Sequence, residues 1–106
     1  MYLKNHLVKF VIDVQMEIIG LNKIIGRSFI PEIDLADPEM SQIVGYVKEV
    51  RGAITDAESV IGVLSMKLAA CEHSAIGDVD EEVQILEEFS HMASKIKPNL
   101  IPLFIN

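Results

Sequence analysis

Two side chains in the last quarter of this 106-residue chain have the spacing of metal ligands. Glu88 and His91 form a Glu-x-x-His pair, and this spacing brings both side chains to one face of a helix. Di-iron bundle proteins combine two such pairs with two further glutamates, whereas this sequence has one pair, to which Glu17 could add a carboxylate. Because the ligand set is incomplete, we expect no metal and no cofactor. A helical-bundle metalloprotein using Glu88 and His91 is the most remote of our hypotheses.

Cys71 and His73 offer the side chains of a zinc site, or of a nucleophile with its base. A structural zinc site needs four ligands, and Cys71 is the only cysteine. Side chains two residues apart on a helix point to different sides, and no third group is placed to orient the histidine. The glycines also lack the spacing of a phosphate-binding loop. We therefore predict that the protein is not an enzyme.

Acidic residues accumulate between positions 68 and 94, a stretch that contains no lysine or arginine. Part of this excess is expected, since acids favour the first turn of a helix. The acidic residues beyond this first-turn preference predict a docking surface for a protein with a basic surface, because opposite charges speed association. The alternative is a solvated face that keeps an apolar protein in solution. The residues predicted to bind the partner are Asp78, Asp80, Glu81, Glu82, Glu87 and Glu88.

The composition limits the possible classes of partner and compartment. The net charge of −7 repels phosphate backbones, so we expect no nucleic-acid binding. The sequence contains no uncharged apolar stretch long enough to predict a membrane span. The N-terminus lacks the apolar core of a signal peptide. The single cysteine fits a reducing compartment. We expect a cytoplasmic protein. Half of the residues are hydrophobic, more than a small monomer readily hides, which predicts a homodimer.

One long predicted helix, residues 38–72, organises the chain. Asp37 is a suitable N-terminal cap, and Pro38 suits the first helical position. Apolar residues recur along it at alternating spacings of four and three, the period of a coiled coil or bundle helix. This central stripe consists of Ile43, Val47, Val50, Ile54, Ala57, Ile61, Leu64, Leu68 and Cys71.

Two shorter predicted helices flank the long one. Residues 3–26 carry an apolar stripe wide enough to contact two neighbours. A short turn over 73–77 leads to a third helix over 78–97, where Asp78 and Glu81 have the spacing of a capping pair. We predict an all-α fold, a three-helix bundle with one long central helix that dimerisation completes.

The chain should form a single domain over residues 1–106, because its length supports one core. We expect Pro98 to end the third helix, since proline cannot continue helical hydrogen bonding. The apolar tail over 98–106 then either folds back onto the bundle or anchors a partner. So apolar a tail would promote aggregation if left free, which favours the first arrangement.

The face of the long helix opposite its central stripe carries small residues at seven-residue spacing. Small side chains allow another helix to approach closely, so this face is one predicted dimer interface, and a plain solvent-facing side is the alternative interpretation of it. The helix over 3–26 is the other element that we expect could form the dimer contact. The predicted interface comprises Gly45, Gly52, Ser59, Val60, Val63 and Met66.

These features predict a small, acidic, non-enzymatic protein-binding module, of the inhibitor, immunity-protein, antitoxin or chaperone type. That class rests on size, charge and fold alone. The alternative is a self-assembling structural subunit that uses the central stripe of the long helix as its assembly surface.

Overall fold

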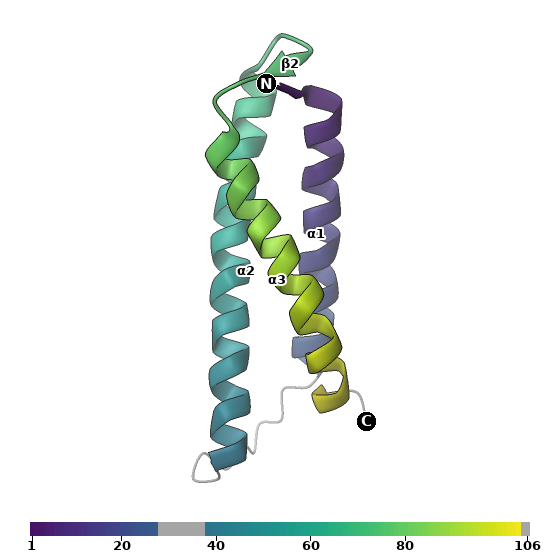
Figure 1. Cartoon of the computed structure of the whole chain (residues 1–106), viewed down its shortest axis with the longest axis vertical. Coiled ribbons are helices and arrows are strands. Elements are labelled where there is room, and N and C mark those ends of the chain that lie inside the picture. Colours follow the sequence, from purple (N-terminus) through teal and green to yellow (C-terminus); the bar gives the residue numbers. More distant parts are fainter. Residues whose placement is uncertain (28–37, 105–106) are drawn as a thin grey trace.

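The chain folds into three helices, as its sequence predicts. The computed structural model describes the backbone of residues 1–27 and 38–104 and the side chains of residues 1–25 and 45–98. Helix α1 (Lys4–Arg27) and helix α2 (Pro38–Ala70) stand side by side with opposite directions. Helix α3 (Asp80–Phe104) crosses both diagonally, from the C-terminal end of α2 to the C-terminal end of α1 (Figure 1). The molecule measures 55 × 21 × 20 Å.

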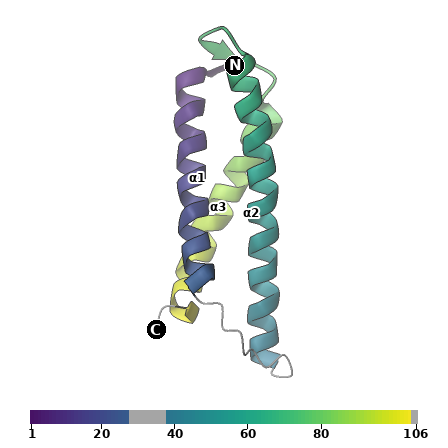
Figure 2. The ribbon, with the colours of Figure 1, turned by 180° about the vertical axis from the view of Figure 1, so that it is seen from behind.

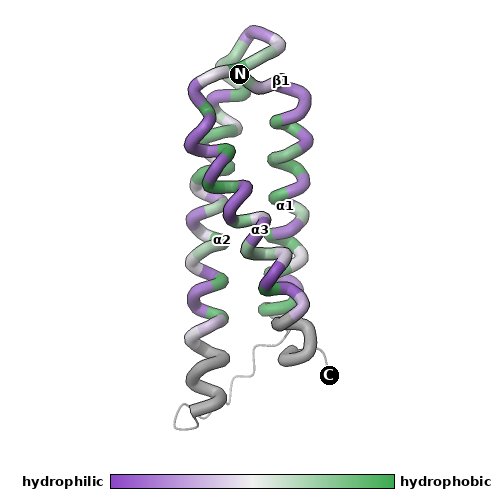
Figure 3. The backbone as a smooth tube through the Cα atoms, viewed as in Figure 1, coloured by the Kyte–Doolittle hydropathy of each residue, from purple (hydrophilic) through white to green (hydrophobic). Residues whose placement is uncertain are grey.

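The central stripe of α2 forms a large part of the core. Six of its side chains are buried, Val47 and Cys71 are half-buried, and Ile43 lies outside the described side chains. Hydrophobic and hydrophilic residues alternate along all three helices, as amphipathic bundle helices require (Figure 3). Helices α1 and α3 of the same chain pack against α2 and cover the described part of the stripe within one chain. The buried residues of the stripe are Val50, Ile54, Ala57, Ile61, Leu64 and Leu68.

A two-stranded sheet ties the start of the chain to the connection between α2 and α3. Strand β1 (Tyr2–Leu3) pairs antiparallel with strand β2 (Ala75–Ile76), where the sequence predicts a simple turn. The backbone nitrogen of Lys4 donates to the carbonyl of Ser74 over 2.9 Å. The Lys4 ammonium also donates to the carbonyl of Cys71, just after the last turn of α2. These bonds bring the N-terminal residues next to the beginning of α3.

The predicted capping pair at the start of α3 does not form. Asp78 has a φ of 57°, in the left-handed region that aspartate tolerates better than most residues. The helix begins two residues later at Asp80, and the carbonyl of Val79 accepts the bond from the Val83 nitrogen over 3.0 Å. Val79 itself is completely buried. The left-handed turn at Asp78 therefore directs Val79, the residue just before α3, into the core, and the predicted cap Asp78 lies one residue further from the helix.

Helix α3 also continues past its predicted end at Pro98. It runs to Phe104, so most of the predicted tail over 98–106 belongs to α3. A proline inside a helix removes one backbone hydrogen bond, here the one to the carbonyl of Ser94. Ser94 and Pro98 are both exposed, and water can satisfy the free carbonyl. Side chains beyond Pro98 lie outside the description, as does Asp37, the predicted cap of α2.

Candidate protein-binding surface

Five exposed carboxylates lie on the solvent side of the first half of α3 and the turn before it. Asp80 and Glu87 are two helical turns apart, and so are Glu81 and Glu88, so each pair shares one side of the helix. The buried side of this segment carries apolar residues. We call this patch the acidic surface; it consists of Asp78, Asp80, Glu81, Glu87 and Glu88.

Glu82, a sixth predicted docking residue, lies apart from the acidic surface. It is half-buried, and its carboxylate forms an ion pair with Lys67 of α2 over 2.7 Å. The hydrogen bond from Lys67 lowers the pKa of Glu82, and the same bond raises the pKa of Lys67. The Lys67 ammonium also donates to the carbonyl of Asp78 over 2.9 Å. Glu82 therefore stabilises the packing of α3 against α2 through this ion pair.

Tyr2 borders the acidic surface, and sequence reasoning does not place it there. A hydrogen bond to Asp80 raises the pKa of Tyr2, and burial and the charge of Glu87 act in the same direction. The ring is half-buried and packs against the core. Only the pairing of β1 with β2 brings Tyr2 to this position, and two-residue strands leave no periodic signal in a sequence. Tyrosine is enriched in protein interfaces, so its location adds an aromatic contact to the acidic surface.

The candidate metal ligands are not brought together. Glu88 and His91 are both exposed, and Glu88 accepts a hydrogen bond from Gln84 over 3.3 Å. Glu17 instead accepts a 2.8 Å bond from Ser90, between α1 and α3. Within the described residues, no group of three or more histidine, cysteine, aspartate or glutamate side chains is placed to hold a metal ion.

The Cys71 thiol is likewise engaged with backbone rather than with an imidazole. It is half-buried and donates to the carbonyls of His73 and Ala75, over 3.6 and 3.5 Å. The His73 side chain is exposed. The thiol therefore contributes to the connection between α2 and β2.

The face of α2 predicted to form a dimer interface is exposed except at Val60, which is half-buried and packs against the core. Gly45, Gly52 and Ser59 are exposed, and a Cβ atom added at either glycine would meet nothing within 4 Å in the described part of the chain. Val63 and Met66 are exposed as well. Beside them, a shallow hollow of about 220 Å³ lies on the surface between α2 and α3. It is lined by Ser59, Val60, Val63, Glu81, Glu82 and Ile85.

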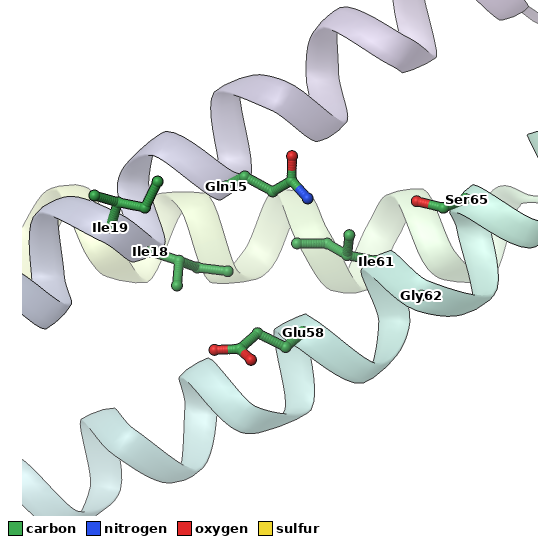
Figure 4. A pocket seen from close by; sticks show the side chains of 7 residues that line it. All are labelled: Gln15, Ile18, Ile19, Glu58, Ile61, Gly62 and Ser65. Atoms are coloured by element: carbon green, nitrogen blue, oxygen red, sulfur yellow. The ribbon is translucent and has the colours of Figure 1, made fainter.

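A larger groove runs between α1 and α2 on the side away from α3. Figure 2 shows this side, with α1 and α2 in front of α3. The groove has a volume of about 640 Å³. Ile18 and Ile61 are its buried apolar residues, and Ile18 extends from α1 toward α2 (Figure 4). The remaining lining residues are Gln15, Ile19, Glu58, Gly62 and Ser65.

Comparison with protein-family models, with curated proteins and with solved structures finds no match to this chain. Among the residues that the structure describes, no helix combines the length and hydrophobicity needed to cross a bilayer.

Proposed function

We propose that this protein is a non-enzymatic binding module that docks a protein with a basic surface on its acidic surface. The observation that carries the proposal is the concentration of five exposed carboxylates on one side of α3 and its preceding turn. Lys67, whose charge acts on Asp78 and Glu81, forms its ion pair with Glu82 rather than with a carboxylate of the acidic surface.

Two physical effects support recognition at this site. Carboxylates gathered on one face repel one another, and a basic partner relieves that repulsion while it is steered toward the face. Tyr2 supplies a flat, partly apolar group at the edge of the charges, where a partner gains contact area. Charge governs the approach in this proposal, and the aromatic ring adds to the bound state.

The test compares two variants of the full chain that lose the same number of charges. In the first, the acidic surface is neutralised by Asp80→Asn, Glu81→Gln, Glu87→Gln and Glu88→Gln. In the matched control, four exposed acids on α1 and α2 are neutralised by Asp13→Asn, Glu49→Gln, Asp56→Asn and Glu58→Gln. Both variants keep the Lys67–Glu82 ion pair.

Wild type and both variants are used to capture partners from the native host, and a partner found by mass spectrometry is then purified. We expect the first variant to associate with this partner about tenfold or more slowly at low salt, and the control to associate at nearly the wild-type rate. The wild-type rate should fall steeply with ionic strength. Equal rates for the two variants would show that the acidic surface is not the docking site.

A further inference from the structure

Helix α1 carries a second apolar stripe, on the side that faces solvent. Four large side chains that belong to no part of the core are between 44% and 63% exposed. Their spacings of four, four and three residues place them on one side of the helix, turned away from α3. We call this set the outer stripe; it consists of Val8, Ile12, Met16 and Ile19.

The outer stripe borders the groove between α1 and α2. Ile19 belongs to both features, and the opposite wall of the groove includes the small residues Gly62 and Ser65. In the described part of the chain, a Cβ atom added to Gly62 would meet nothing within 4 Å. An exposed apolar stripe beside a groove that contains both apolar and polar side chains is a surface that a bundle helix can bury against another helix.

The spacing of the outer stripe fits a second copy of the same helix as the element that covers it. The four positions are nearly symmetric about Val14: Ile12 and Met16 lie two residues on either side, and Val8 and Ile19 lie six and five residues away. Two copies of α1 that run antiparallel, with a two-fold axis at the level of Val14, place Ile12 opposite Met16. They also place Val8 opposite Ile19. This self-complementarity is the property of an interface between identical subunits.

The exposed area of the chain fits the same arrangement. The whole chain exposes 7202 Å², whereas a compact monomer of 11.8 kDa is expected to expose about 5,900 Å². The difference, roughly 1,300 Å², exceeds the roughly 800 Å² that each partner buries in an interface of standard size. This excess belongs to the chain as a whole, and it is large enough for one interface of standard size.

We infer that the outer stripe is the interface with a second copy of this chain, whose α1 packs antiparallel against it. This assigns the dimer contact to α1 rather than to the small-residue face of α2. It leaves the acidic surface, on the solvent side of α3, free for another partner.

Two lysine substitutions at exposed methionines separate the two helices as interfaces. Met16 lies in the outer stripe and is 63% exposed, and Met66 on α2 is 74% exposed. Sedimentation equilibrium should show a dimer for wild type and for Met66→Lys, and at least about a tenfold increase in the dimer Kd for Met16→Lys. Circular dichroism checks that both variants remain helical. A monomeric wild type, or dissociation by Met66→Lys but not by Met16→Lys, overturns the inference.

Disulfide cross-linking tests the antiparallel orientation directly. The background variant Cys71→Ser removes the native thiol and keeps a donor for the carbonyls of His73 and Ala75. An equal mixture of Val8→Cys and Ile19→Cys chains should form a disulfide-linked heterodimer on mild oxidation. Val8→Cys alone should not, because two copies of residue 8 lie about 18 Å apart along the helix axis. Efficient cross-linking of Val8→Cys to itself would instead show a parallel arrangement.

Discussion

Glu17 is a carboxylate in the α1–α3 interface with only part of its hydrogen bonding satisfied. One oxygen accepts the 2.8 Å bond from the Ser90 hydroxyl. The other is buried and has no hydrogen-bond partner within the described part of the chain. A hollow of about 130 Å³ adjoins it, with Lys97 among the lining residues. Since a buried polar atom without a partner costs free energy, the Ser90 hydroxyl has an effect larger than its single bond suggests.

We expect Ser90→Ala to lower the free energy of unfolding by about 1–3 kcal/mol, because it leaves the Glu17 carboxylate without its remaining donor. Urea denaturation of wild type and variant measures the difference. In the double variant Glu17→Met with Ser90→Ala, both polar partners are replaced, and much of the loss should be recovered. An unchanged urea midpoint for Ser90→Ala would show that the hydroxyl does not stabilise the carboxylate.

The Lys67–Glu82 ion pair gives the fold a defined response to acid. Because the pKa of Glu82 is lowered in the folded state, the pair stabilises the fold above the ordinary glutamate pKa of about 4.3. That contribution is lost as the pH falls through the lowered value. Glu82→Gln should therefore unfold at less urea than wild type near neutral pH, and the two midpoints should converge in acid.

A control on the same helix distinguishes this effect from general charge repulsion. Glu88 is exposed, so Glu88→Gln removes the same charge without breaking an ion pair. It should not reproduce the neutral-pH loss seen for Glu82→Gln. If Glu82→Gln and wild type differ by the same amount across the whole pH range, the ion pair does not cause the difference.

At the scale of the elements, periodic patterns predict more than local stop signals do. The predicted helices over 3–26 and 38–72 agree with α1 and α2 to within two residues, and the central stripe is buried as expected. Such predictions succeed because every turn of a helix repeats the same information. Pro98 is a single local signal, and α3 continues through it. The carbonyl that loses its bond belongs to Ser94, an exposed residue, so water can replace the missing donor.

The candidate site is predictable only in part, for a related reason. The charges of the acidic surface are visible in the sequence. The sequence does not show that Lys67 reaches Glu82 from a neighbouring helix, which separates Glu82 from the other acids. Nor does it show Tyr2 beside Asp80, because that contact depends on a sheet of two residues per strand. Contacts between elements depend on how the elements pack, and local sequence patterns do not predict this packing.

At the scale of the whole molecule, α3 holds the other two helices together. It crosses α1 and α2 and packs extensively on both, whereas α1 and α2 contact each other less (Figure 1). Leu86 of α3 and Val79, just before the helix, are completely buried and contribute to a core shared by the three helices. A helix pair that lacked α3 would expose much of this core to water, so we expect the three helices to unfold in one cooperative transition.

Leu86→Ala tests this shared core. Removing a fully buried leucine side chain should cost about 2–5 kcal/mol, a large fraction of the roughly 5–15 kcal/mol that stabilises a typical domain. Ile85→Ala, at a neighbouring position that is 37% exposed, should cost less. Thermal melts followed by circular dichroism should give one transition for each protein, with the midpoint of Leu86→Ala lowered by about 4–8 °C per kcal/mol. If Leu86→Ala melts in two steps, and helical signal persists after the first, then α1 and α2 form a stable pair without α3.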